Sequence, residues 1–342
     1  MPMQNPFSLD TVRIPITRII DRERQIAYLR EHAIVNSANV LVTGEFGIGK
    51  TCLLRKFRAG LQNEFGEKVL LIEMEMRRLS QDTSEFLGDV LLKLIGVFWE
   101  RILKRPYSQL IRAVTSPADV REQLLPQVRQ VLELYRMLRP ECITADLEEH
   151  NVIGVTGIVK ASKDEKLIRH VVQSPLSPSE FVSLADEILV ALEEHGVERT
   201  IIFGDEANHI DPEIEIDLLR RHFEAFAQRN VQFVLTAKAE VLEQIPRLKD
   251  AFPARVDIAP FEEPTALDEI LQVYTAGAAV PAFSLRAREF IWRISHGKPR
   301  EIQRICQACV EHVQSAAALS TGEVDVETVL QSVATVYELI PR

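Results

Sequence analysis

One short segment restricts the choice of fold more than any other, the residues GEFGIGKT at positions 44 to 51. They match the pattern G-x-x-x-x-G-K-[ST] at every position. Glycines let a backbone fold around an anion with its N–H groups pointing inward, where a Cβ would obstruct it. With 14 glycines in 342 residues, chance would produce this pattern in about three chains per thousand of this composition. The segment therefore predicts a loop that binds the phosphates of a nucleotide.

The residues on either side of this loop have the periodicity that the motif requires. NVLVT (39–43) is an apolar, β-branched strand, and TCLLRKFRAGLQNEF (51–65) is an amphipathic helix. The amino end of that helix would present its unpaired N–H donors and positive dipole to the phosphates. We expect Lys50 to reach the β and γ phosphates and the Thr51 hydroxyl to complete the coordination of Mg²⁺. The predicted nucleotide-binding residues of the loop are Gly44, Glu45, Phe46, Gly47, Ile48, Gly49, Lys50, Thr51 and Cys52.

Further strand patterns alternate with helical ones along the chain. The strand patterns cover 68–76, 199–207, 231–237 and 255–261, and the clearest helical pattern between them covers 215–230. This alternation predicts βαβ units and a mostly parallel sheet with helices on both faces. The expected fold class is α/β, a P-loop NTPase sheet of the ASCE type with five core strands.

Two regions fall outside this predicted sheet. Residues 77–198 form a long insert between the second and third strands, largely helical, with helices expected at 84–104, 118–138 and 177–196 and a hairpin around 151–162. Residues 264–342 show helical patterns throughout, broken at Gly297-Lys298-Pro299. The sequence therefore predicts a core domain at 1–263, which contains the insert, and an all-α lid domain at 264–342.

Polar residues stand at the ends of two predicted strands. TIIFGDEAN (200–208) ends in two adjacent acids, Asp205 and Glu206. Beside a phosphate loop, Asp205 would hold the magnesium ion, and Glu206 would orient and deprotonate the attacking water. Adjacent acids after a buried strand can instead cap the next helix. Thr236 ends the fourth strand, where it would either sense the γ-phosphate or merely begin a turn.

The composition of the chain disfavours some classes of binding partner. A net charge of −10 and a pI of about 5.4 disfavour a protein that holds DNA mainly through phosphate contacts. The basic cluster Arg101, Lys104 and Arg105 is best interpreted as a solvated helix end. No apolar run approaches the length of a membrane span, and MPMQNPFSLDTVRIP lacks a secretory pattern, so we expect a cytoplasmic protein with reduced thiols. Cys306 and Cys309 are expected in a helix core rather than at a zinc ion, since no second ligand pair follows.

Together these motifs resemble the AAA+ superfamily, most closely its origin-recognition-like and STAND-like branches, over roughly residues 15–340. Besides the loop and the acidic strand, the resemblance rests on IDRE (20–23) and GKPREIQRIC (297–306). It implies that Arg22 touches the adenine, that Thr236 is the first sensor, and that Arg300 is the second sensor, which reaches the γ-phosphate from the lid. It also implies that Arg255 is an arginine finger offered to a neighbouring subunit.

The chain departs from this resemblance in three respects. Asp21 replaces the usual glycine before Arg22, the insert is longer than normal, and we expect no winged-helix domain after the lid. The guanine-reading N-K-x-D pattern is missing, so ATP is the expected nucleotide.

Three functional hypotheses remain open. The first is an ATP-hydrolysing switch that forms a homo-oligomer or engages a protein partner in its ATP state, through residues 77–198 in the latter case. The second is a DNA-associated helper ATPase, similar to transposition regulators or replication initiators. The third is a nucleotide-dependent binding module with little turnover.

Overall fold

The structure is a computed structural model, and its described residues are 7, 16, 19–20, 22–75, 83–102, 104, 178–205, 207, 216–276, 281–315 and 323–337. Contacts along the chain group it into two compact units. The first unit is Met1–Glu64, Val234–Glu243 and Phe252–Arg342, and the second is Phe65–Phe233 and Gln244–Ala251. The predicted boundary at residue 263 falls within the first unit.

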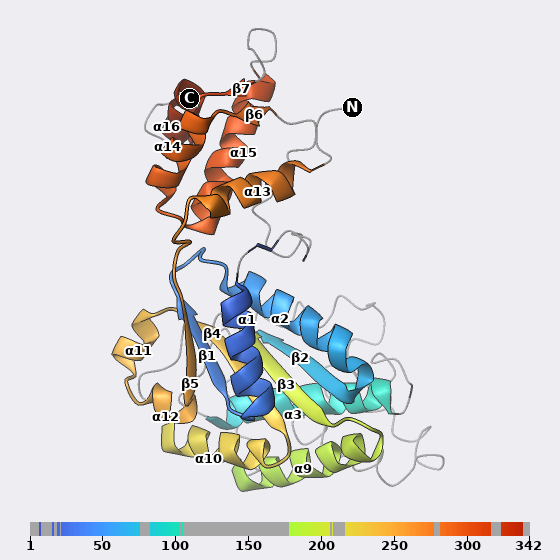
Figure 1. Ribbon diagram of the computed structural model, residues 1–342. Helices are drawn as coiled ribbons and strands as arrows, with labels where there is room; N and C mark the ends of the chain where they lie inside the picture. Colours follow the sequence, from blue (N-terminus) through green and yellow to red (C-terminus); the bar gives the residue numbers. More distant parts are fainter. Residues whose placement is uncertain are drawn as a thin grey trace, which may run out of the picture. The chain divides into compact units, whose positions relative to one another are not determined.

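Five strands form the main sheet (Figure 1). They are β1 (Val40–Gly44), β2 (Val69–Glu75), β3 (Arg199–Asp205), β4 (Val231–Ala237) and β5 (Ala254–Ile258). Their order is β2-β3-β4-β1-β5, and the pairs β1–β4, β1–β5 and β2–β3 are parallel. The predicted five-stranded parallel sheet with flanking helices is therefore confirmed. One strand, β4, stands between the strand before the glycine loop and the strand with the acidic pair, as the ASCE type requires.

In the first unit, one helix precedes β1 and another follows the glycine loop. They are α1 (Glu23–Arg30), which continues as the π-helical turn η2 (Glu31–Val35), and α2 (Lys50–Phe65). The helix α2 buries Leu53, Leu54, Phe57 and Leu61. This spacing of three to four residues is the apolar stripe that the sequence predicted.

The carboxyl-terminal part of the first unit is mainly helical. Its elements are α13 (Thr265–Thr275), β6 (Ala282–Phe283), α14 (Leu285–Ser295), α15 (Pro299–Ser315), β7 (Glu323–Val324) and α16 (Val326–Val336). The Ser284 and Asp325 side chains cap α14 and α16 by accepting from the N–H groups of Ala287 and Thr328. The parallel pair β6–β7 corrects the expectation of an all-α lid. Two-residue strands are too short to give an alternating pattern, so the sequence does not reveal them.

The core of this helical part also takes in residues from the beginning of the chain. Phe7 and Ile19 are buried among side chains of α13, α14, α15 and α16. The Phe7 ring stacks on the Tyr274 ring with centroids 5.5 Å apart, and its edge meets Phe283. The amino-terminal segment thus contributes to a core that lies more than 250 positions further along the sequence.

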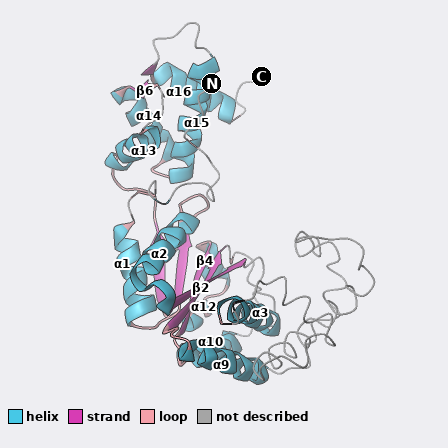
Figure 2. Ribbon diagram, turned by 90° about the vertical axis from the view of Figure 1, so that its right-hand side faces the viewer, coloured by secondary structure: helices cyan, strands magenta, loops and turns pink. Residues whose placement is uncertain are grey.

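The second unit is built around β2 and β3. Its main helices are α3 (Thr83–Arg101), α9 (Pro178–Glu194) and α10 (Ile216–Ala227), and its short elements are η3 (Gly66–Lys68) and α12 (Leu248–Ala251). The short helix α11 (Glu240–Gln244) belongs to the first unit except for its last residue. Helices α3 and α9 lie side by side (Figure 2). The Phe223 ring of α10 stacks on Phe233 of β4 with centroids 4.3 Å apart. The helix expected at 118–138 and the hairpin at 151–162 lie outside the described residues.

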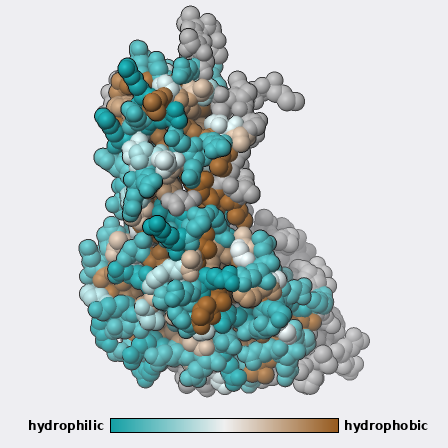
Figure 3. Space-filling view, viewed as in Figure 1, coloured by the Kyte–Doolittle hydropathy of each residue, from teal (hydrophilic) through white to brown (hydrophobic). Residues whose placement is uncertain are grey.

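The described surface is mostly hydrophilic on the face drawn in Figure 3. Within the described part of the chain, no helix combines the length and the apolar character that crossing a membrane demands.

We expect Phe7→Ala to destabilise the first unit by about 3–5 kcal/mol, because a fully buried aromatic ring leaves a cavity when it is removed. Leu285→Ala is the control, since Leu285 is 64 % exposed, and its effect should stay within about 0.5 kcal/mol. Urea denaturation of the three proteins measures both values. Equal stability of Phe7→Ala and the parent would contradict the placement of Phe7.

Candidate nucleotide-binding site

The glycine loop joins the buried strand β1 to the amino end of α2. Every residue of β1 is buried, and α2 begins at Lys50. Ile48 is 1 % exposed and fastens the middle of the loop to the core, while its N–H donates to the Glu45 carbonyl at 3.4 Å. The loop is therefore anchored at both ends and at its middle.

Lys50 folds back across this loop. Its Nζ donates to the Gly44 carbonyl at 2.7 Å and to the Glu45 carbonyl at 2.9 Å. The first turn of α2 contains no acidic residue, although acidic residues are favourable at that end of a helix. The positive end of the helix and the ammonium group thus lie together without a carboxylate in that turn, which is the charge arrangement that a phosphate requires.

The loop also has room on one side. At Gly49, where φ is +98°, a Cβ atom would meet no heavy atom within 4 Å. An oxygen ligand follows Gly49 closely, because Thr51, a partly exposed residue with a hydroxyl group, lies in the first turn of α2. Mg²⁺ prefers oxygen ligands and usually takes few of them from the protein. The residues of the loop therefore fit a phosphate chain with Mg²⁺.

Arg300, the predicted second sensor, lies against this loop. Its N–H donates to the Gly47 carbonyl at 3.3 Å, and its guanidinium lies over the Phe46 ring, 4.5 Å from the centroid. A Cβ at Gly47 would come within 2.9 Å of the Arg300 side chain, and φ at Gly47 is +77°. Only glycine allows this close approach between the loop and the start of α15.

A second residue of the same turn was not identified from the sequence. Lys298 forms an ion pair with Glu45, with Nζ 2.5 Å from the carboxylate. The sequence signalled only a helix break at this position, because the charge of a lysine does not reveal its partner. The turn 297–300 therefore contacts the loop at Glu45, Phe46 and Gly47.

Arg22, which the resemblance implies to touch the adenine, is a buried side chain. It is 5 % exposed, and its guanidinium donates to the carbonyls of Ile48 and Ala259 at 3.3 and 3.2 Å. The same group lies over the Phe261 ring, 4.6 Å from the centroid. The guanidinium thus contacts two main-chain acceptors and an aromatic face, and its contact with the adenine stays a prediction.

Three predicted residues lie on or after strand ends. Thr236 is fully buried on β4 and pairs in register with Val42 of β1. Asp205 is the last residue of β3, partly exposed and in register with Glu75. Glu206 lies outside the described residues. The roles assigned to these residues remain predictions.

Arg255 lies on the exposed face of β5. It pairs in register with Leu41, three residues before Gly44, and forms a 2.6 Å ion pair with Asp257. Asp257 also accepts a hydrogen bond from the Thr43 hydroxyl. At a rise of about 3.3 Å per residue, Arg255 is displaced about 10 Å along the strand from the loop.

Solved structures share this architecture. The chain is similar to Cdc6p from Pyrobaculum aerophilum, with 16 % identity over 97 % of this chain and 70 % of that one, at a TM-score of 0.50. The chain has the AAA+ fold. The chain is also similar to Aeropyrum pernix Orc1 in complex with DNA (16 % identity, 95 % of this chain and 68 % of that one covered, TM-score 0.49) and to the Thermotoga maritima RuvB Holliday junction branch migration motor (14 % identity, 94 % and 73 % covered, TM-score 0.45). The sequence matches no protein-family model and no curated protein.

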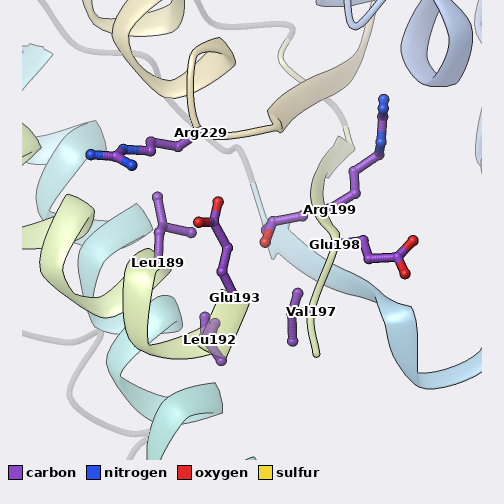
Figure 4. Close-up of a pocket in the computed structure, with 8 residues that line it drawn as sticks. Leu189, Leu192, Glu193, Val197, Glu198, Arg199 and Arg229 are labelled. Carbon is purple, nitrogen blue, oxygen red and sulfur yellow. The ribbon is translucent and has the colours of Figure 1, made fainter. Parts of the chain in front are cut away.

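A separate hollow lies in the second unit of the chain (Figure 4). Leu189, Leu192 and Val197 line its apolar side, at the amino end of β3, and Arg229 at its edge is ion-paired with Asp186. Its space of about 180 Å³ includes open solvent and is smaller than the ~300–1,000 Å³ of usual ligand pockets. It lies at the opposite end of β3 from Asp205 and is not the candidate site.

The two cysteines of α15 are core residues of the helical carboxyl-terminal part. Cys306 and Cys309 are both buried. Burial raises the pKa of the Cys306 thiol well above its usual value and raises the pKa of Cys309 to about 11. The described residues contain no cluster of three or more His, Cys, Asp or Glu side chains that could hold a metal ion. Both thiols are therefore expected to stay protonated and unreactive in the folded protein.

We expect iodoacetamide at pH 8 to modify Cys306 and Cys309 only after unfolding, because the thiolate is the reactive form. Cys52, which is partly exposed, serves as the internal comparison and should react in the native protein. Peptide mapping by mass spectrometry after timed quenching measures the three rates. Native modification of Cys306 as fast as that of Cys52 would contradict the assignment.

Proposed function

We propose that this chain binds ATP with Mg²⁺ at residues 44–51 and hydrolyses it. The observation that carries the proposal is the loop itself, where the Lys50 ammonium and the amino end of α2 lie together with no acid in the first helical turn. When bound, Mg²⁺ would neutralise part of the charge on the phosphate oxygens. Thr51 and Asp205 have the oxygen atoms to hold it, directly or through its water shell.

The two residues of the acidic pair, Asp205 and Glu206, have different proposed roles in hydrolysis. Asp205 serves the metal ion, and Glu206 accepts the proton of the attacking water, since a carboxylate is the general base that this motif supplies. Thr236, buried at the end of β4, is proposed to sense the γ-phosphate. Arg300 is proposed to act on the phosphates from within the same chain, a role that its position against Gly47 supports.

Arg255 is proposed to act on the ATP of a neighbouring copy. It is about half exposed, and within its own chain it is displaced by about 10 Å along the strand from Gly44. An arginine can reach a phosphate and stabilise the charge that develops there, and this contribution is worth ~10³–10⁵ in rate. We infer that the ATP state assembles copies of the chain and that hydrolysis resets them.

A function as a DNA-associated helper ATPase remains the alternative to this proposal. The net charge of −10 does not favour it, and Arg101 of the described basic cluster donates to the Glu67 main-chain carbonyl. Adding duplex DNA to the ATPase assay over a range of salt concentrations tests this alternative, because phosphate contacts weaken as salt rises.

Two variants separate binding from hydrolysis. Glu206→Gln should bind Mg-ATP as the parent does and release phosphate ~10²–10⁴ times more slowly, since only the base is lost. Lys50→Ala should bind about 10- to 100-fold more weakly, because a charged hydrogen-bond donor is lost. Calorimetry and phosphate release measure the two effects.

Lys68→Ala is the matched control, since Lys68 forms an exposed ion pair with Glu198. It should leave both quantities unchanged. A parent protein that gives no heat of binding with Mg-ATP would overturn the proposed function, and an unchanged rate for Glu206→Gln would remove Glu206 as the base.

The arginine finger predicts a rate that depends on protein concentration. The phosphate-release rate per chain should rise with concentration in the parent and stay at its low value in Arg255→Ala, because no neighbour then supplies the finger. Arg247→Ala, which breaks an exposed pair with Asp217, should behave as the parent. Light scattering on Glu206→Gln with Mg-ATP checks assembly, and a monomeric mass at every concentration would exclude the trans role.

A further inference from the structure

Arg22 buries a positive charge between two main-chain segments of the first unit. Its Nη2 donates to Ile48 in the middle of the glycine loop, and its Nη1 donates to Ala259, just after β5. Two main-chain carbonyls and the Phe261 ring lie against the guanidinium. A side chain that is 5 % exposed and makes such contacts fixes the positions of both segments.

The contact with Ile48 determines the direction of the next amide. The peptide bond from Ile48 to Gly49 is trans and planar, so its N–H points away from its C=O. Arg22 holds the C=O, and the Gly49 N–H therefore points to the opposite side of the peptide. Gly49 is also the position where an added Cβ would meet no atom within 4 Å. Arg22 thus controls how the loop presents an amide donor.

The segment after β5, which Arg22 contacts at Ala259, is itself hydrogen-bonded to the turn before α15. The Phe261 N–H donates to the Gly297 carbonyl at 3.0 Å, and a Cβ at Gly297 would lie 2.3 Å from the Phe261 carbonyl. Gly297 has a φ of +68°, which suits this close approach. Residues 298 and 300 of the same turn then contact Glu45 and Gly47. The loop and this turn are thus connected through Arg22 and Phe261 as well as directly.

The backbone at Arg22 is strained, and its neighbours hold it in place. Its φ of 132° is a conformation that L-residues rarely adopt, at a cost of about 1–3 kcal/mol. The Lys56 ammonium on α2 donates to the Ile19 carbonyl at 3.0 Å and to Glu23 at 2.7 Å. The hydrogen bond from Lys56 is the main reason that the pKa of Glu23 is lowered. The entry to α1 is therefore fastened to the helix that begins at Lys50.

We propose that Arg22 is a positioning residue that couples occupancy of the glycine loop to the segment 259–261 and the turn 297–300, by holding the Ile48 and Ala259 carbonyls at once. This role rests on the proposed ATP binding and needs no contact with the base. A lysine cannot replace the arginine, because one ammonium on a flexible stem lacks the rigid fork that reaches two carbonyls.

Hydrogen exchange with mass spectrometry tests the coupling in the full chain, with and without a slowly hydrolysed Mg-ATP analogue. In the parent, the nucleotide should slow exchange in peptides covering 45–53, 259–264 and 297–304. In Arg22→Lys at a saturating concentration of the nucleotide, exchange should still slow at 45–53, while the slowing at 259–264, about 5-fold or more in the parent, should disappear. Arg24→Lys is the matched control, since Arg24 is the exposed arginine two residues away, and it should behave as the parent.

The outcomes separate this inference from the proposed function. A parent that shows no slowing at 45–53 and no heat of binding would overturn the function and the coupling together. Slowing at 45–53 in the parent without slowing at 259–264 would overturn the coupling alone. Faster basal exchange in Arg22→Lys with the nucleotide effect at 259–264 preserved would also overturn it, because that is the result of a purely structural role.

A second variant guards against misfolding. Arg22→Gln retains an amide donor but neither the charge nor the fork, and it should lose the same coupling. Unchanged exchange in peptides from 216–233 of the second unit, in both variants, shows that the chain has folded. A variant that passes this check and keeps the parent's slowing at 259–264 would refute the proposal.

Discussion

Donors that occupy the carbonyl oxygens of the glycine loop set the conformation on which the candidate site depends. Lys50 takes those of Gly44 and Glu45, the Arg300 N–H takes that of Gly47, and Arg22 takes that of Ile48. Each accepted hydrogen bond fixes the plane of a peptide and hence the direction of the following N–H. A loop rich in glycine would otherwise lose much conformational entropy on binding an anion. The fold supplies this order in advance, which is the general route to tight binding by main-chain amides.

Two of these four carbonyls are held by residues that lie far from the loop in sequence. Arg22 precedes β1, and Arg300 lies in the first turn of α15, 253 positions after Gly47. The loop conformation is therefore a property of the whole first unit and not of the eight-residue motif alone. A change in the turn 297–300 or in the segment after β5 alters the same peptides that would contact phosphates. Sequence motifs of this kind thus specify a nucleotide site only within a fold that provides the outer donors.

The elements that sequence reasoning located well are those with a strong local pattern. The strand 231–237 coincides with β4, because a short, mainly apolar run between two turn signals favours a strand that is buried on both faces. The buried positions of α15 follow a spacing of three to four residues, as the sequence indicates. Periodicity reports that a residue is buried but does not name its partner. For this reason three contacts were not predicted. They are the hydrogen bond from Arg22 to Ala259, 237 positions away, the Lys298–Glu45 ion pair, and the stacking of Phe7 on Tyr274.

The direct contacts between the glycine loop and the turn before α15 are weak, so a ligand can change the preferred arrangement of this turn. The Lys298–Glu45 pair is 35 % and 56 % exposed, and such pairs contribute about 0–1 kcal/mol. The Arg300–Phe46 contact is also near the surface, since Phe46 is 65 % exposed, and adds about 0.5–1 kcal/mol. With one main-chain hydrogen bond, the total is on the order of 1–3 kcal/mol. A ligand whose affinity differs by about 5- to 150-fold between two arrangements of this turn can reverse such a preference. The buried connection through Arg22 and Phe261 involves no exposed charge pair, so it can persist while the outer contacts change. This division between a durable inner link and a reversible outer one suits a nucleotide switch better than a rigid binding module.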